Sequence, residues 1–66
     1  MISYAPLWKT MEEKGVSTYT LRNKHHIGGG TIQRLQNNET VSTNTLDLLC
    51  KILKCNLNGI IEFIDD

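Results

Sequence analysis

The sequence predicts one small all-α domain of five short helices, with short extended segments at the two ends of the chain. Apolar residues recur at the three- and four-residue spacing of helices rather than at the alternate spacing of strands. Glycine, serine and asparagine separate these stretches where helices commonly begin and end. With 66 residues, of which 39% are apolar and 21% charged, we expect residues 1–66 to form a single domain.

The first expected helix spans about Pro6–Lys14. Proline suits the first turn of a helix, because its missing N–H is not needed there. Tyr4, Leu7 and Met11 then recur at helical spacing. Gly15 is expected to end this helix as its C-terminal cap.

Two shorter helices are expected next, separated by a tight turn. Ser17 offers a side-chain oxygen that caps a helix over about Thr18–Lys24. The third helix is expected over about Gly29–Gln36, after a Gly28-Gly29-Gly30 run. Each glycine inside a helix costs about 1 kcal/mol relative to alanine, so packing against the rest of the domain must hold this first turn.

The clearest amphipathic pattern predicts a fourth helix over about Thr43–Lys54, capped by Ser42. Its apolar residues fall at positions i, i+3, i+4 and i+7, namely Leu46, Leu49, Cys50 and Leu53. Asn56 is expected to cap a short fifth helix over about Leu57–Ile61. This last helix is expected to close the core.

The two ends of the chain are expected to be extended. Ile2–Tyr4 and Glu62–Ile64 both contain β-branched or aromatic residues, which favour strands. We therefore expect these two segments to pair with each other.

The net charge is zero, but the two halves of the chain differ in sign. Residues 1–34 contain five basic and two acidic side chains, a balance of +3, and residues 35–66 contain two basic and five acidic ones, a balance of −3. Such asymmetry indicates a basic face that meets an anionic partner. Two ordinary solvated faces are the alternative.

No membrane span, signal peptide, metal site or cofactor is expected. No apolar run approaches the roughly 20 residues of a membrane helix, so we expect a cytoplasmic protein. Cys50 and Cys55 would point about 140° apart on one continuous helix, with Cα atoms roughly 7 to 8 Å apart. Two free thiols are therefore expected. Together with His25 and His26 they show no familiar zinc spacing.

Two short helices joined by a tight turn, with one helix before them and two after, form the layout of a helix-turn-helix DNA-binding domain. The chain resembles the phage repressor and Cro class of these regulators, the XRE type, and within it the small single-domain bacterial members. Those members begin with a Tyr-x-Pro-Leu-Trp segment, which is Tyr4–Trp8 here. The further matches cover nearly the whole chain: Ser17-Thr18, Leu21-Arg22, Ile27, Ile32, Leu35, Asn37, Val41-Ser42, Leu46, Leu49, Cys50-Lys51, Leu53, Cys55, Leu57 and Ile60-Ile61-Glu62-Phe63.

The resemblance implies a lambda-repressor-like fold of five helices whose third helix enters the major groove of double-stranded DNA. It places the base contacts on Gly28, Gly29, Gly30, Thr31, Gln33 and Arg34. It places phosphate contacts at Thr18 and Asn37. A homodimer on a palindromic site is implied, because one unit covers only a half-site.

The chain departs from the family pattern at two places. His26 occupies a turn position that usually carries a glycine with positive φ. The three glycines stand where relatives carry side chains that read bases, and glycine has none to offer. Direct readout then falls to Arg34, which suits guanine, to Gln33, which suits adenine, and to Thr31.

A protein-interaction module that keeps the fold but binds DNA weakly or without specificity is the competing hypothesis. Enzymatic activity is not expected, because no nucleophile, base and orienting acid occur in a suggestive arrangement, and no small-molecule substrate is evident. For the homodimer, the expected apolar surface combines two residues of the fourth helix with two of the C-terminal segment: Leu48, Ile52, Phe63 and Ile64.

Overall fold

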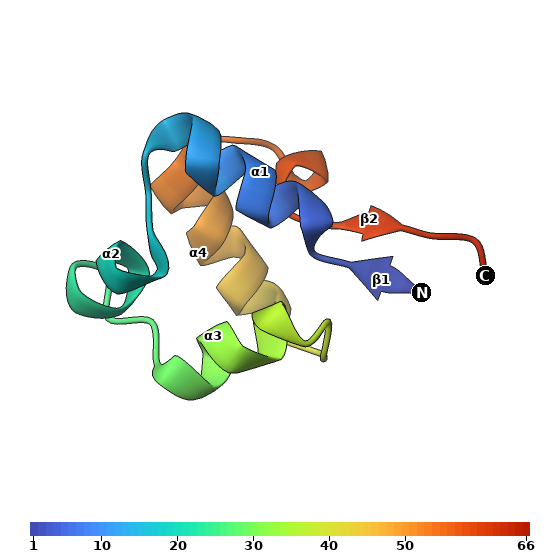
Figure 1. Ribbon diagram of the computed structural model, residues 1–66, viewed down its shortest axis with the longest axis horizontal. Helices are drawn as coiled ribbons and strands as arrows, with labels where there is room; N and C mark the ends of the chain where they lie inside the picture. Colours follow the sequence, from blue (N-terminus) through green and yellow to red (C-terminus); the bar gives the residue numbers. More distant parts are fainter.

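The computed structural model describes all of residues 1–66, and four α-helices make up most of it (Figure 1). α1 and α4 pack beside each other, α2 lies at one end, α3 lies along the lower side in this view, and the two chain termini project together at the other end. No helix combines the length and the apolar character needed to cross a membrane. The elements in chain order are β1 (Ile2–Ser3), α1 (Ala5–Lys14), α2 (Thr18–Asn23), α3 (Gly29–Gln36), α4 (Thr43–Leu53), the 3-10 turn η1 (Leu57–Gly59) and β2 (Glu62–Phe63).

Local capping explains where the helices begin and end. The Ser17 and Ser42 side chains accept hydrogen bonds from backbone N–H groups in the first turns of α2 and α4, at 3.1 and 3.2 Å. Gly15 ends α1 in the left-handed conformation at φ 68°. These three predicted caps are confirmed, because each depends only on a residue and its near neighbours.

The turn between α2 and α3 is closed by a backbone hydrogen bond in which the N–H of Ile27 donates to the carbonyl of Leu21, at 3.0 Å. His26 adopts φ 59° in this turn. The prediction that His26 takes a left-handed conformation usually given to glycine is confirmed. Ile27 follows it into the core.

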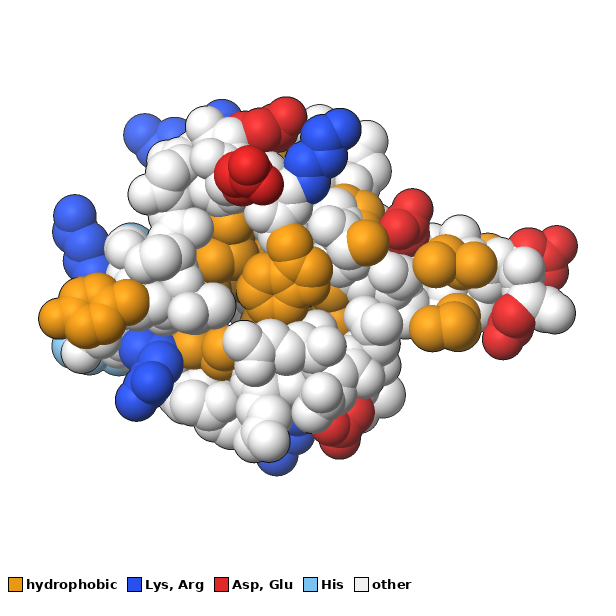
Figure 2. All heavy atoms as spheres, viewed as in Figure 1, with side chains coloured by type: hydrophobic (Ala, Val, Ile, Leu, Met, Phe, Trp, Pro, Cys, Tyr) orange, Lys and Arg blue, Asp and Glu red, His pale blue; other side chains and the backbone are white.

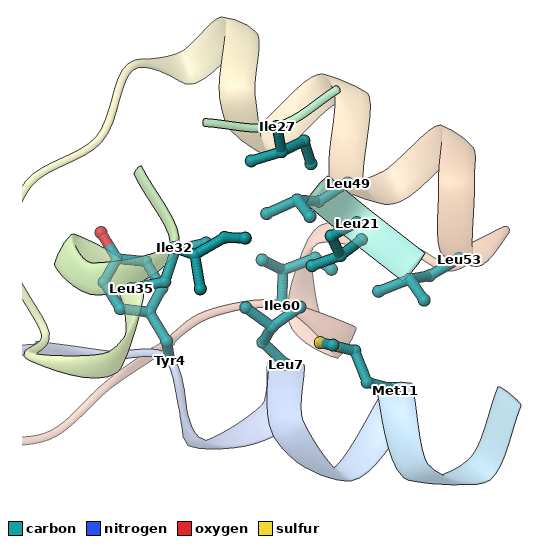
Figure 3. Close-up of a cluster of buried hydrophobic side chains, with 10 residues drawn as sticks. All are labelled: Tyr4, Leu7, Met11, Leu21, Ile27, Ile32, Leu35, Leu49, Leu53 and Ile60. Carbon is teal, nitrogen blue, oxygen red and sulfur yellow. The ribbon is translucent and has the colours of Figure 1, made fainter. Parts of the chain in front are cut away.

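Ten buried side chains form one core, drawn in Figure 3, and every α-helix contributes to it. The fully buried members include one leucine each from α1, α2 and α3, two from α4, and an isoleucine that follows η1: Leu7, Leu21, Leu35, Leu49, Leu53 and Ile60. Truncating a buried leucine to alanine costs about 2–5 kcal/mol in proteins. The relative placement of α2 and α3 therefore depends on this shared cluster.

The domain is mostly helical, and its two chain ends form a short two-stranded antiparallel sheet. Ile2 pairs with Phe63 and Ser3 with Glu62. The N–H of Ile64 also donates to the carbonyl of Met1, at 2.8 Å. The predicted pairing of the two end segments is thus confirmed, and backbone hydrogen bonding between them is the reason that they form strands.

The expected fifth helix over Leu57–Ile61 is wrong, since only the single 3-10 turn η1 forms there. Asn56 makes no side-chain cap, so the first turn lacks the bond that would start a helix. The hydroxyl of Thr10 donates to the carbonyl of Gly59, at 2.7 Å. This contact with α1 holds the turn while the chain extends toward β2. The protein therefore has four α-helices rather than five.

Two other helices end one residue earlier than expected. α2 ends at Asn23 instead of Lys24. α4 ends at Leu53, because Lys54 turns into the left-handed conformation at φ 52° and cannot continue the helix. α3 begins at Gly29 and ends at Gln36, as predicted.

Replacing Gly29 and Gly30 together by glutamine is expected to stabilise the protein. Neither glycine has a positive φ, and a Cβ atom built on either meets no atom within 4 Å. Both positions lie in the first turn of α3, so we expect a combined gain of about 1 kcal/mol and a rise in Tm of roughly 4 to 8 °C. Thermal unfolding followed by circular dichroism measures the change.

The matched control is Gly15→Gln, which places a side chain at φ 68° and is expected to lower Tm. An unchanged or lowered Tm in the double variant would contradict a helical first turn in α3.

Candidate nucleic-acid interface

α3 presents one polar, glycine-rich face to solvent. Its buried side consists of Ile32 and Leu35, which reach into the core. Gln33, Arg34 and the run Gly28–Gly30 are exposed. Because the two sides follow from helical periodicity, burying the apolar pair turns the polar positions outward.

The beginning of α3 exposes bare backbone. Gly28 is its N-cap and makes no side-chain cap. A Cβ atom built on any of the three glycines of Gly28–Gly30 meets nothing within 4 Å, so this end of the helix is open. The first N–H groups of a helix lack partners within it and form the positive end of its dipole. The structure therefore places unshielded N–H donors where the resemblance places base-reading side chains.

The two residues assigned to phosphate contacts have different surroundings. Thr18, the first residue of α2, is half-buried. Asn37, at the end of α3, is exposed, and its side-chain N–H donates to a carboxylate oxygen of Glu39, at 3.3 Å. A phosphate contact by Asn37 therefore requires this exposed hydrogen bond to be exchanged for one to phosphate.

An open groove lies between α3 and the beginning of α4, with a volume of about 400 Å³. Its lining combines one guanidinium group with several hydroxyls: Thr31, Arg34, Thr40, Val41, Ser42 and Thr45. Thr31 is half-buried and lies in this groove instead of on the outermost face of α3. Sequence reasoning missed the contribution of residues 40–45, although their hydroxyl-rich composition is visible in the sequence.

The N-terminal segment holds the loop that forms one wall of this groove. The hydroxyl of Tyr4 donates to the carbonyl of Glu39 at 2.7 Å, and the N–H of Tyr4 donates to the side-chain oxygen of Asn38 at 3.0 Å. Asn38 itself adopts φ 56°. Tyr4 therefore fixes the path of the chain from α3 to α4.

Positive charge gathers at the α2 end of the molecule. Figure 2 shows Lys, Arg and His side chains at the end that α2 forms, and Asp and Glu at the tip formed by the chain termini. Arg22, Lys24 and Arg34 are exposed, and none of them takes part in a salt bridge. The end that α2 forms thus carries exposed cations that take part in no salt bridge, and the tip formed by the chain termini is acidic.

These features define a helix-turn-helix DNA-binding domain: an exposed helix set across a tight turn from a shorter helix, with unpaired cations beside it. The chain belongs to the Cro/C1-type HTH DNA-binding domain family, whose model matches residues 6–66. It is similar in structure to the transcriptional regulator VanUg, with a TM-score of 0.88 and 31% sequence identity over 98% of this chain and 87% of that one. A comparison with curated proteins gives no significant match. The predicted family is confirmed, and a DNA-binding regulator is supported.

Proposed function

We propose that this protein regulates transcription by binding double-stranded DNA with α3 in the major groove. The observation that carries the proposal is the two-sided character of α3, which buries Ile32 and Leu35 and leaves Gln33 and Arg34 exposed. An α-helix fits the width of the major groove, and both exposed side chains suit base edges there. The family match and the likeness to a transcriptional regulator support this function.

Different residues are assigned to the bases and to the sugar-phosphate backbone of the DNA. Arg34 suits bidentate contact with guanine, and Gln33 suits contact with adenine. The glycines at the start of α3 leave room for close approach of the DNA backbone, to which N–H groups can donate. Thr18, Asn37 and the hydroxyls of the groove beside Arg34 are assigned to phosphate and sugar contacts. In this division few side chains read bases, so we expect modest sequence selectivity.

A protein-interaction module is the second candidate function. It is favoured by Phe63, which is 71% exposed on β2, and by the acidic side chains gathered at the same end. The DNA titration described below distinguishes the two functions.

We further propose that the protein binds its site as a homodimer through the terminal sheet. Ile2 on β1, Phe63 on β2 and Ile64 directly after β2 are all exposed. Met1 and Ile64 exchange hydrogen bonds, so Ile2 and Phe63, the next pair along, direct their own N–H and C=O groups to the outer edges of the sheet. Open edges of this kind pair readily with another strand.

The apolar residues that the sequence predicts for the dimer surface differ in how exposed they are. Ile52 packs against the core, so it offers little surface to a partner. Leu48 is exposed on α4. The partner for the sheet is a second copy of this chain, because two half-sites of a palindrome require two units related by a two-fold axis.

DNA binding is expected to fall steeply with salt and to depend on Arg34 for selectivity. Selection from a random duplex library supplies the preferred sequence, and fluorescence anisotropy measures affinity for it and for a random duplex at several salt concentrations. The logarithm of affinity should fall linearly with the logarithm of salt, by about 0.9 per phosphate neutralised. Arg34→Ala should reduce discrimination between the two duplexes by about 1 to 3 kcal/mol.

The matched control is Arg22→Ala, which removes an exposed cation from α2 and should weaken binding to both duplexes equally. If Arg34→Ala weakened binding to the preferred and the random duplex equally, Arg34 would be a phosphate contact and not a residue that reads bases. Absence of binding even at low salt would reject the DNA function and favour the protein-interaction module.

The homodimer is expected to weaken when Phe63 is replaced by serine. The side chain is exposed and β2 pairs through its backbone, so the fold should survive while the apolar contact between copies is lost. Sedimentation velocity at micromolar concentration compares this variant with the wild type. Tyr19→Ser is the control, because Tyr19 is 73% exposed on α2 at the far end of the molecule. A wild-type protein that stays monomeric even on a palindromic duplex would refute the dimer.

A further inference from the structure

Cys50 and Cys55 are brought together where α4 ends. The left-handed conformation of Lys54 reverses the chain, and the N–H of Cys55 then donates to the carbonyl of Cys50, at 3.2 Å. In helix ends closed by a six-residue bond of this type, the two flanking side chains commonly pack against each other. The expectation that placed the two cysteines on one continuous helix does not apply, because α4 ends at Leu53, before Cys55.

Both cysteine residues are partly exposed to solvent and partly enclosed by neighbouring side chains. Each cysteine is free and half-buried, and each packs against the core. Cys55 also lies against Gly59, where a Cβ atom would come within 3.1 Å of its Sγ atom. Glycine at this position therefore leaves the space that the thiol occupies. The hydroxyl of Thr10 also contacts this glycine, because it donates to the carbonyl of Gly59.

The neighbouring Cys55 thiol influences the ionisation of Cys50. Burial raises the pKa of the Cys50 thiol, and interaction with the Cys55 thiol raises it further. No group of three or more potential metal ligands gathers anywhere in the chain, so the pair lacks further protein ligands for a metal ion. We therefore consider the chemistry of the two neighbouring thiols themselves.

We propose that Cys50 and Cys55 form a reversible intramolecular disulfide when the protein meets a peroxide. The bond would join the end of α4 to the segment that leads through η1 to β2. This inference rests on the helix end alone and is independent of the proposed DNA function.

The reaction balances in two steps. The thiolate of one cysteine attacks one oxygen of hydrogen peroxide, the O–O bond breaks, and a sulfenic acid and hydroxide form; the hydroxide takes up the proton that this thiol released and becomes water. The sulfur of the other cysteine then attacks the sulfenic sulfur, the S–O bond breaks, and the proton of the attacking thiol leaves with the hydroxyl as a second water molecule. The sulfur pair loses two electrons and the peroxide gains them.

The experiment measures how strongly the folded structure favours the bond. The full chain is treated with one equivalent of hydrogen peroxide, and intact mass should fall by two hydrogen atoms with both thiols lost together. Dithiothreitol should restore both. Equilibration with reduced and oxidised glutathione then gives the effective concentration of the pair, expected to be at least about tenfold higher in the folded protein than in urea.

Variants separate this geometry from ordinary thiol reactivity. Cys50→Ser should accumulate a glutathione adduct on Cys55 and no internal bond. Lys54→Gly, which adopts positive φ without strain, should keep the effective concentration, and Lys54→Val, whose branched side chain disfavours that conformation, should lower it. Equal effective concentrations in buffer and urea, or glutathione adducts and linked dimers in place of the internal disulfide, would overturn the proposal.

Discussion

The burial of Leu21 and Leu35 in one core with Leu49 is the constraint on which the interface depends. α2 has six residues and α3 has eight, lengths at which isolated helices are not stable in water. α3 carries the further penalty of glycine in its first turn. Packing against α4 therefore holds both helices in place, and the exposed face of α3 exists because its other side is buried.

The same constraint sets what the interface offers to a partner. With its apolar side chains turned inward, α3 presents backbone at its beginning and Gln33 and Arg34 further along. The groove beside Arg34 depends on a second, independent attachment, in which Tyr4 bonds to the loop between α3 and α4. Because Tyr4 directly follows β1, the terminal sheet and the loop next to α3 are connected by a short stretch of chain. A contact between two copies at the sheet would thus lie close to the segment that positions the groove.

Sequence reasoning succeeded where structure depends on near neighbours. Ser17, Ser42 and Gly15 act within one turn of themselves, and the bounds of α3 were predicted correctly despite its glycines.

Sequence reasoning failed where contacts between residues far apart in the sequence determine the structure. The contact between Thr10 and Gly59 joins residues 49 positions apart, and it helps to hold a single turn where a fifth helix was expected. The meeting of Cys50 and Cys55 depends on a left-handed lysine, a residue type that carries no signal for that conformation. The groove beside Arg34 likewise arises only when α3 and α4 are set side by side.

The central claim is that the beginning of α3 and its exposed face are the surface that meets DNA. Backbone amide chemical shifts of the isotope-labelled protein, recorded while a duplex is added at low salt, test it most directly. The largest changes should fall on Gly28–Arg34, with smaller ones at Thr18, Asn37 and the hydroxyl-lined groove. Changes confined to the terminal sheet, or spectra that do not respond to the duplex, would contradict the account.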